Sequence, residues 1–196
     1  MRRQRYVEYR FDNPPLLQIV ADRLTAPLIG PGRYGRLLDA AGLMPGESVL
    51  DFGCGSGIGA RTIAKRIGPG GKLACVDVSA FWMNTCSQRL RGFSNVDFYR
   101  GDLRQLPVPD AAFDLVFVCQ VLRFIADADR RSVFDALSGK LAAGGRMLVC
   151  EKTAPRSGLS PQTIRSLAAG AGLTETHSAL DGGQITLLFS GPGDLR

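Results

Sequence analysis

A short apolar segment runs straight into a glycine-rich turn at residues 49–57, which read Val-Leu-Asp-Phe-Gly-Cys-Gly-Ser-Gly. Alternating glycines allow the backbone to turn tightly and let a ligand approach where a Cβ atom would collide. The amphipathic stretch from Ile58 to Ile67 then predicts a helix, and the free backbone N–H groups at its start would face that ligand. The pattern predicts a strand, a small-molecule binding loop and a helix in succession.

From residue 48 onward, strand-like and helix-like segments alternate. Strands are predicted at residues 48–52, 72–76, 96–99, 113–119 and 146–151, and helices at residues 58–67, 80–90, 127–141 and 161–171. Strands separated by helices imply right-handed crossovers and a parallel sheet. Gly144-Gly145 is expected to turn the chain into the fifth strand.

Two further strands, 173–180 and 184–189, flank Asp181-Gly182-Gly183, which is a hairpin signal. This hairpin places one antiparallel strand in the sheet. We therefore expect an α/β fold with a doubly wound, mostly parallel seven-stranded sheet that ends in a C-terminal hairpin. The 196 residues suffice for one domain, with a core at residues 48–190.

Residues 1–47 lie outside the alternation and predict one or two helices, 15–28 and 32–41, that form a cap or lid over the core. Residues 1–36 hold seven arginines and three acidic residues, out of a net charge of +6 for the chain. A basic amphipathic segment favours an anionic membrane surface, a nucleic acid or an anionic substrate as partner. A solvated helix face would have the same composition.

Composition indicates a globular protein, since 45% of residues are hydrophobic and 21% are charged. No apolar run reaches the roughly 18 residues of a membrane span, and no signal peptide is recognised. The five cysteines are scattered without a CxxC pair, which favours a reducing cytoplasm over a disulfide scaffold or a zinc site. We expect no bound metal. Cys54 in the glycine loop and Cys119 at a strand end either face a pocket or are structural.

Ligands of open parallel sheets bind beyond the carboxyl ends of the strands, and polar residues gather at those positions. Asp51 ends the first predicted strand. Asp77 follows the second, twenty-four residues after Gly53, where a carboxylate can accept hydrogen bonds from both hydroxyls of a ribose. Asp102 follows the third strand and Gln120 the fourth.

A dinucleotide enzyme would also use a glycine loop and a ribose carboxylate. Its G-x-G-x-x-G fingerprint fails from Gly53, because the sixth position is Ile58. Counted from Gly55, it ends at Ala60, which is a tolerable variant. Asp51, two residues before the first glycine, and the later segments distinguish the two alternatives.

Five segments, in order and at the expected spacing, resemble the motifs of class I S-adenosylmethionine-dependent methyltransferases. They are the first motif at residues 49–57, the acidic second motif at 76–79, the adenine segment at 101–103, the fourth strand at 113–116 and the entry to the fifth strand at 141–148. The resemblance covers about residues 45–190. It implies a Rossmann-like methyltransferase fold and S-adenosylmethionine as the cofactor, with S-adenosylhomocysteine as product.

The resemblance also implies roles for individual residues. Asp51 would hold the amino group of the cofactor, and the backbone from Gly53 to Gly57 would approach its methionine part. Asp77 would bind the ribose hydroxyls, and Asp102 would accept a hydrogen bond from the adenine amino group. Trp82 would stack on adenine or pack in the core. The remaining expected cofactor contacts are Cys54, Gly55, Val78, Leu103 and Cys119.

Methyl transfer is an in-line displacement that depends mainly on alignment, which is consistent with the lack of an acid–base pair in the sequence. The single histidine, His177, lies on a predicted strand and is expected to be a packed or surface residue. Asp12-Asn13-Pro14-Pro15 resembles the signature of enzymes that methylate adenine or amide nitrogens, but that signature follows the fourth strand, here residues 118–122. Nucleic acid is therefore not the expected substrate.

A small-molecule acceptor fits best, because residues 153–158 form a short connection without an added domain, and the N-terminal segment must close the site. Candidate lid and substrate residues are Tyr6, Tyr9, Phe11, Tyr34 and Gln120. One alternative is a phospholipid headgroup N-methyltransferase, since apolar residues recur near helical spacing from Leu16 to Leu28 beside arginines, as in a membrane-surface helix. A helix docked on the core would show the same stripe. Another alternative is a non-catalytic S-adenosylmethionine-binding protein, and an oligomer stays open.

Overall fold

The computed structural model describes residues 13–153 and 159–191. These residues form two compact units, residues 13–108 and residues 109–191, and each is described separately. The predicted lid residues Tyr6, Tyr9 and Phe11 lie outside the described residues, as does most of the short connection expected at residues 153–158.

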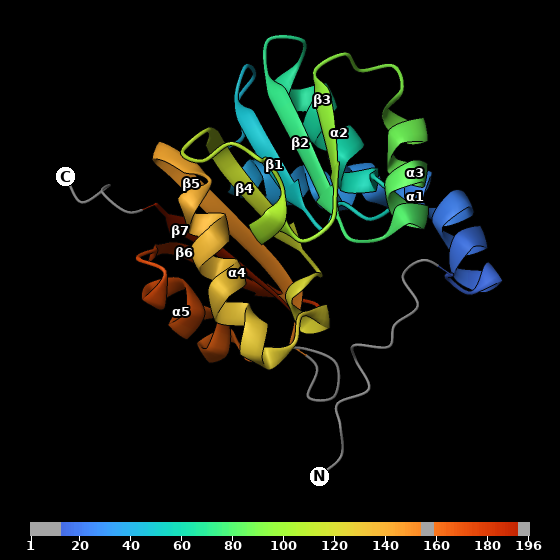
Figure 1. Ribbon diagram of the computed structural model, residues 1–196. Helices are drawn as coiled ribbons and strands as arrows, with labels where there is room; N and C mark the ends of the chain where they lie inside the picture. Colours follow the sequence, from blue (N-terminus) through green and yellow to red (C-terminus); the bar gives the residue numbers. More distant parts are fainter. Residues whose placement is uncertain (1–12, 154–158, 192–196) are drawn as a thin grey trace. The chain divides into compact units, whose positions relative to one another are not determined.

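The first unit contains three parallel strands, three α-helices and one short 3-10 helix (Figure 1). Along the chain these are α1 (Leu16–Ala40), β1 (Ser48–Phe52), α2 (Ile58–Ile67), β2 (Lys72–Asp77), α3 (Ala80–Leu90), β3 (Val96–Arg100) and the short helix η2 (Leu103–Gln105). Strand β2 lies between β1 and β3 and pairs in parallel with both. Helix α2 contacts β1 and β2, and α3 contacts β2 and β3.

The sequence of each element explains its place. Val49 and Leu50 on β1 are fully buried. Helix α2 buries Ile63 and Ile67 on one side and carries basic residues in its last turn, where they complement the helix dipole. Ser79 caps α3, because its hydroxyl accepts a hydrogen bond from the Trp82 backbone N–H over 3.2 Å.

The described residues of the second unit contain four strands, two α-helices and one short 3-10 helix. They are β4 (Phe113–Cys119), η3 (Leu122–Phe124), α4 (Asp127–Gly139), β5 (Leu141–Lys152), α5 (Pro161–Gly170), β6 (Thr174–Asp181) and β7 (Gln184–Ser190). Strand β5 pairs in parallel with β4 and antiparallel with β7, and β7 pairs antiparallel with β6. Ser160 caps α5, whose first residue is Pro161.

The strands form one mixed seven-stranded sheet in the order β3-β2-β1-β4-β5-β7-β6. Strand β7 runs antiparallel to both of its neighbours, β5 and β6, so the predicted fold class and the role of the C-terminal hairpin are confirmed. His177 lies exposed on β6, whose residues are all exposed.

One predicted boundary is wrong. The helix expected to reach Leu141 ends at Gly139, and β5 begins at Leu141 instead of Arg146. Gly144-Gly145 does not end one element and start another, but lies within the strand. Gly144 has a φ of 75°, and the register against β4 shifts between Phe113 and Leu115. The glycines thus form an irregularity inside the strand, which glycine permits at positive φ.

The N-terminal region forms one helix, α1, in place of two, and Pro14 precedes it as a buried residue. Several apolar side chains of α1 are exposed, with Leu17 at 80% and Leu28 at 82%. Among the described residues, no helix combines the length and apolarity needed to cross a membrane.

Candidate functional site

The glycine loop, residues 53–57, is shaped by the end of strand β2. The backbone N–H groups of Gly53 and Cys54 both donate to the carbonyl of Val76, at 2.8 and 3.1 Å. Gly53, Gly55 and Gly57 all have positive φ, between 53° and 81°, a region that other residues rarely adopt. An added Cβ atom at Gly55 would meet no heavy atom within 4 Å. The backbone at Gly55 is therefore open to a ligand.

Asp77 links this loop to the next strand. One oxygen of its carboxylate accepts a hydrogen bond from the Gly55 N–H, and the other accepts one from the Ser79 N–H, each over 2.9 Å. Burial raises the pKa of Asp77, and these two hydrogen bonds partly offset that rise. A carboxylate held in this way orients the loop as well as presenting negative charge at the end of β2.

Asp51 lies at the end of β1 with 4% exposure. Burial, followed by the charges of Cys86 and Asp77, raises the pKa of Asp51 well above its usual value. Ionising two neighbouring carboxylates together costs free energy, because burial and mutual repulsion disfavour the charged forms. A cationic ligand lowers that cost. The site is therefore electrostatically suited to a ligand that brings positive charge.

Three thiols lie behind the loop. The sulfur atoms of Cys54, Cys75 and Cys86 are all within 4.8 Å of one another, and all three residues are buried. Hydrogen bonds from the thiols of Cys54 and Cys75 lower the pKa of Cys86 to about 5, helped by Arg89. The sequence predicted that Cys54 either faces a pocket or is structural. In the structure its thiol is one of the three in this cluster.

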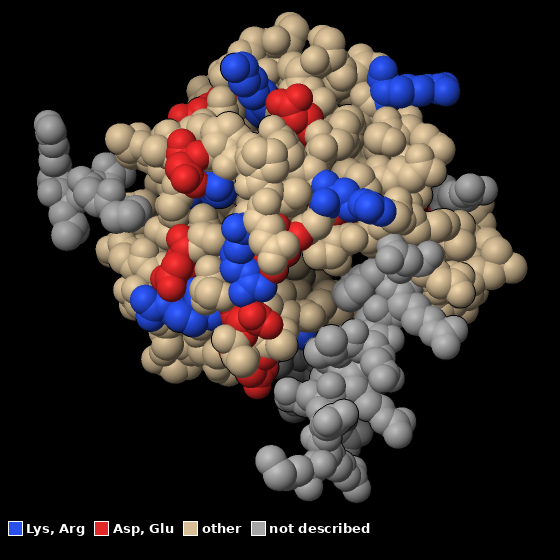
Figure 2. Space-filling model, viewed as in Figure 1, with Lys and Arg blue, Asp and Glu red and all other residues tan. Residues whose placement is uncertain are grey.

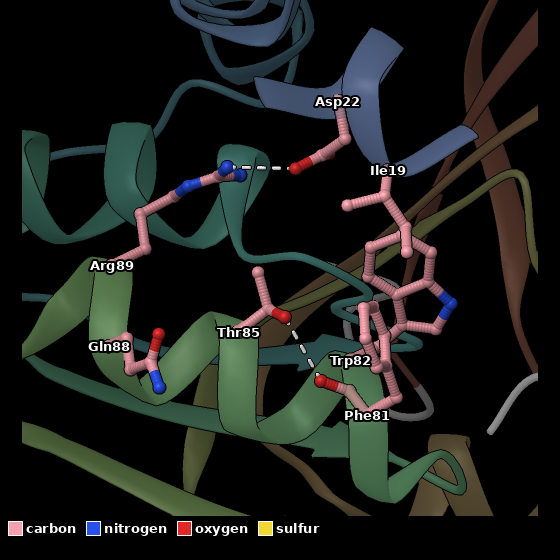
Figure 3. A pocket seen from close by; sticks show the side chains of 7 residues that line it. All are labelled: Ile19, Asp22, Phe81, Trp82, Thr85, Gln88 and Arg89. Carbon is pink, nitrogen blue, oxygen red and sulfur yellow. Dashed lines mark hydrogen bonds and ion pairs between the residues drawn. The ribbon is translucent and has the colours of Figure 1, made fainter. Parts of the chain in front are cut away.

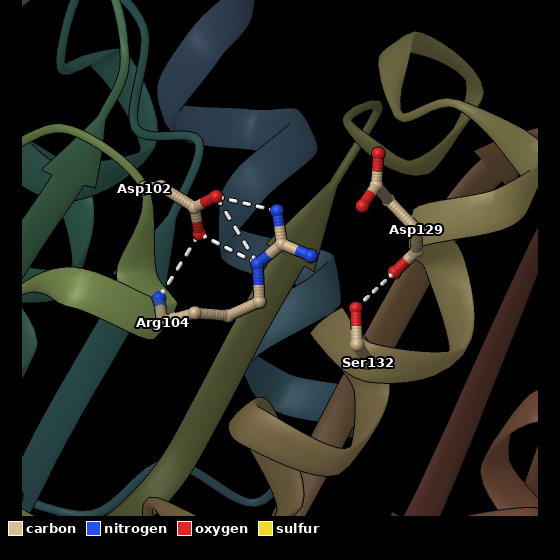
Figure 4. Close-up of polar contacts among 4 residues, drawn as sticks. All are labelled: Asp102, Arg104, Asp129 and Ser132. Atoms are coloured by element: carbon tan, nitrogen blue, oxygen red, sulfur yellow. Dashed lines mark hydrogen bonds and ion pairs between the residues drawn. The ribbon is translucent and has the colours of Figure 1, made fainter.

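After β3, Asp102 caps the short helix η2, which begins at Leu103. Figure 4 shows Asp102 beside Arg104. The Asp102 carboxylate accepts hydrogen bonds from the backbone N–H of Arg104, at 3.0 Å, and from its guanidinium. That guanidinium lowers the pKa of Asp102. Leu103 is 2% exposed. The expected adenine contact of Asp102 therefore competes with a bound arginine, which the sequence pattern did not indicate.

Helix α1 contacts the glycine loop through polar side chains. Ser56 donates a hydrogen bond of 2.5 Å to the Asp22 carboxylate, and Arg89 on α3 donates to Ser56 over 3.0 Å. Arg89 also forms an ion pair of 2.9 Å with Asp22, and the two side chains are only 20% and 13% exposed. Asp22, Ser56 and Arg89 thus fasten the N-terminal helix to the loop.

A pocket of about 260 Å³ lies beside this contact, between α1 and α3 (Figure 3). Ile19 and Asp22 line it from α1, and Trp82 and Arg89 from α3. Trp82 is 7% exposed and meets the ring of Phe81 edge to face, with 5.0 Å between the ring centroids. Trp82 therefore packs in the unit and also borders a pocket, and its stacking on adenine stays a prediction.

Tyr34, a predicted lid residue, lies on α1 against α2. An added Cβ atom at Gly59 would approach the Tyr34 ring to 3.0 Å, so the ring covers this glycine. The guanidinium of Arg33 lies 5.7 Å from the centroid of the same ring. In the structure Tyr34 serves helix packing. Val78, a predicted cofactor contact, is 58% exposed after β2.

In the second unit, polar residues follow β4 and end β5. Gln120 has a φ of 62°, unusual for a residue other than glycine. Both polar atoms of its amide are buried and find no partner among the described residues. Its backbone N–H donates to the carbonyl of Cys150 over 2.8 Å. Cys119 is partly exposed at the end of β4. Strained backbone and a buried amide without a partner among the described residues make Gln120 a candidate ligand-binding residue.

Glu151 was missed by sequence reasoning, although it ends the predicted fifth strand. It is fully buried, and one of its oxygens accepts a hydrogen bond of 2.7 Å from the Leu122 N–H. The other oxygen is buried, and no described residue hydrogen-bonds to it. Burial raises the pKa of Glu151, partly offset by the Leu122 hydrogen bond. The sequence did carry a signal for Glu151, namely a carboxylate at the carboxyl end of a predicted strand. The same signal made Asp51 and Asp77 candidate site residues.

Comparison with known protein families shows which family this segment of the chain belongs to. Residues 49–145, which include the glycine loop, Asp77 and Asp102, match the family model described as a methyltransferase domain. The matched segment belongs to this methyltransferase family. The resemblance predicted from the five sequence motifs is thus confirmed.

Curated relatives of the methyltransferase domain are longer proteins. A ubiquinone/menaquinone biosynthesis C-methyltransferase, UbiE, from Hahella chejuensis is 31% identical over 121 residues, which cover 60% of this chain and 48% of that protein. The chain therefore spans about half the length of this relative.

Solved structures share the fold of the methyltransferase domain. A putative S-adenosylmethionine-dependent methyltransferase from Methanococcus maripaludis superposes with a TM-score of 0.77 at 14% identity, over 99% of this chain and 98% of that one. The N-methyltransferase NodS from Bradyrhizobium japonicum, solved with S-adenosyl-L-homocysteine, gives a TM-score of 0.70 at 20% identity, over 95% and 96% of the two chains.

Charges on the surface of the protein are mixed. Figure 2 shows basic and acidic side chains interspersed over the described part of the face in view. Several are paired, such as Arg131 with Asp135 and Arg165 with Glu175. On the described part of this face, basic side chains do not gather into a single patch.

Proposed function

We propose that the methyltransferase domain binds S-adenosylmethionine at the glycine loop and transfers its methyl group to a small-molecule acceptor. The observation that carries this proposal is a pair of neighbouring carboxylates, the buried Asp51 and the half-buried Asp77, beside an open glycine backbone. S-Adenosylmethionine is a cation at its sulfonium and its amino group, and it also carries a ribose. The carboxylates and the loop suit both features.

The proposal assigns each residue a task. Asp51 binds the amino group of the cofactor, Asp77 its ribose hydroxyls, and the backbone from Gly53 to Gly57 its methionine part. Asp102 turns toward adenine when it exchanges part of its contact with Arg104. Trp82, Leu103, Val78, Cys54 and Cys119 complete the expected contacts. The sulfonium supplies an activated methyl group, so alignment of the acceptor for in-line displacement is the main demand on the protein.

The N-terminal segment closes the site in this proposal. Support comes from the contact of Asp22 with Ser56, because it joins α1 directly to the glycine loop. We assign residues 1–47 to a cap and residues 48–190 to the catalytic core of one domain. The predicted lid residues Tyr6, Tyr9 and Phe11 belong to that cap.

Gln120 and Glu151 are proposed to bind a polar group of the acceptor. A buried amide and a buried carboxylate oxygen without partners carry a desolvation cost that a hydrogen-bonding ligand would remove. The amide can donate or accept, whereas the carboxylate needs a donor. An acceptor with an amine or hydroxyl group is therefore favoured, in line with a small polar molecule.

The test is transfer of a labelled methyl group from S-adenosylmethionine to a panel of small amines, thiols and phenols. We expect label in one chemical class, and Gln120→Ala to reduce that transfer without changing cofactor affinity. Gln105→Ala serves as the matched control, because Gln105 is an exposed amide in η2. Cofactor binding with no transfer to any acceptor would favour the non-catalytic binding protein instead.

One observation favours a second acceptor class, a phospholipid headgroup amine. Leu16, Leu17, Leu24 and Leu28 on α1 are each at least 66% exposed, as an apolar helix face at a membrane surface would be. Sedimentation with liposomes of anionic or zwitterionic lipid, at low and high salt, distinguishes the two. Binding to anionic liposomes that salt weakens would support the lipid acceptor, and no sedimentation would support the small soluble one. We assign a cytoplasmic location from the five free cysteines.

A further inference from the structure

The three clustered thiols come from three different elements. Cys54 belongs to the glycine loop, Cys75 to β2 and Cys86 to α3. Their separations in sequence match no metal-binding motif, so only the fold brings them together. Cys75 and Cys86 are fully buried, and Cys54 is 8% exposed. The other two cysteines, Cys119 and Cys150, lie on strands of the second unit.

The spacing of the sulfur atoms suits coordination of one ion. A metal–sulfur bond of about 2.3 Å places three sulfur atoms roughly 4 Å apart around a central ion. In the structure the three sulfur atoms lie within 4.8 Å of one another. An inward movement that brings the sulfur atoms from within 4.8 Å to about 4 Å of one another therefore completes a three-sulfur site.

The donor set determines which ions fit. Three sulfur atoms select soft, thiophilic ions, whereas structural zinc sites use four ligands. The described residues offer this cluster no fourth cysteine or histidine. Cu(I) accepts three sulfur ligands, and the Arg89 charge near Cys86 offsets part of the negative charge that three thiolates would bring.

We propose that Cys54, Cys75 and Cys86 form a buried three-sulfur binding site for a soft metal ion of the Cu(I) class. Each thiol loses its proton as it coordinates. Because Cys54 belongs to the glycine loop, an ion in this site ties the loop to β2 and α3. This binding does not depend on the proposed methyl transfer, and it is measured without cofactor or acceptor.

The test is an anaerobic titration of the reduced full chain with Cu(I), in competition with a chromogenic Cu(I) chelator. We expect one ion per chain, and X-ray absorption should show three sulfur neighbours. Cys75→Ser and Cys86→Ser should each weaken binding at least tenfold. Cys150→Ser is the matched control, because this cysteine is equally buried but outside the cluster, and it should bind as the native chain does.

Thermal unfolding of each variant establishes that it folds. Should a cluster variant fail to fold, the X-ray absorption spectrum of the native chain decides, since it needs no substitution. The proposal is overturned by no stoichiometric Cu(I) binding, by fewer than three sulfur neighbours, or by unchanged binding in folded cluster variants. Preferred binding of Zn(II) with four ligands would overturn it as well.

Discussion

The Asp77 carboxylate accepts a hydrogen bond from the Gly55 backbone N–H over 2.9 Å, which joins two segments 22 residues apart in sequence. Through this bond the end of β2 fixes the glycine loop that follows β1. The predicted ribose-binding residue thus has a second task, which is to hold the loop in its binding conformation.

Asp77→Asn should weaken S-adenosylmethionine binding by about 10- to 100-fold, since a hydrogen bond to a charged group contributes about 1.5–3 kcal/mol. Calorimetric titration measures the change. Asp97→Asn is the control, because Asp97 is an exposed carboxylate on β3, and its affinity should match the native value. Equal affinities in both variants would contradict the role of Asp77.

Asp51→Asn should stabilise the protein without cofactor while weakening cofactor binding. The pKa of Asp51 is raised in the folded state, so its ionisation costs stability at any pH above that folded pKa. As pH falls through the folded pKa toward the unfolded one, the native carboxyl gains its proton and the cost disappears. The variant's advantage in chemical unfolding should therefore be largest above the folded pKa of Asp51 and vanish in acid. An advantage that grew on acidification would contradict this account.

Acidification should also weaken cofactor binding by the native chain. Burial raises the pKa values of both Asp51 and Asp77, so these groups become protonated at higher pH than ordinary carboxyls do. Protonation removes the negative charge that attracts the cationic cofactor. Calorimetric titrations at several pH values should show that the affinity for the cofactor already falls above roughly pH 4, where ordinary carboxyls are still ionised. In Asp51→Asn this dependence should be shallower, and an unchanged dependence would argue against Asp51.

The contact of Asp22 with Arg89 should contribute measurable coupling energy. Both side chains are mostly buried, so a double-mutant cycle with alanine should give about 1–2 kcal/mol between them. The exposed pair Arg131 and Asp135 is the comparison and should give about 0.5 kcal/mol or less. Similar coupling in the two pairs would contradict the fastening of α1 to the loop.

Gly57→Ala should destabilise the protein by about 2–4 kcal/mol, because the residue has positive φ and the new methyl group collides. The added Cβ would lie 2.7 Å from the Cys86 sulfur and 3.0 Å from the Cys86 Cα. Gly92→Ala is the control, since nothing lies within 4 Å of its added Cβ. Chemical denaturation should show little change in the free energy of unfolding for Gly92→Ala. A loss of well under about 2 kcal/mol for Gly57→Ala would contradict the close packing of Gly57 against Cys86.

Sequence patterns predicted the fold well, because strand and helix periodicities are local. Residues 48–52 and 58–67 matched their elements, and so did the hairpin at 181–183. The prediction at Gly144-Gly145 was wrong. A glycine pair between a helix and a strand has the same sequence as a glycine pair that forms an irregularity within a strand. The pairing across β4 and β5 decides between them, and it is non-local.

Part of the candidate site was likewise predicted from the sequence, and part became known only from the structure. Motif spacing identified Asp51, Asp77 and the glycines, since their positions follow from the chain order of strands and loops. The Asp22 contact with Ser56, the arginine on Asp102 and the three-thiol cluster depend on side chains from separate elements. Glu151 carried a signal at a strand end, but its unpaired oxygen becomes visible only once burial is known.

The central claim is that the glycine loop binds S-adenosylmethionine, and calorimetric titration of the native chain tests it most directly. We predict one binding site per chain for S-adenosylmethionine and for S-adenosylhomocysteine, and weaker binding of both by Asp77→Asn. Absence of heat and of any bound cofactor for both compounds, with a folded protein, would contradict the account.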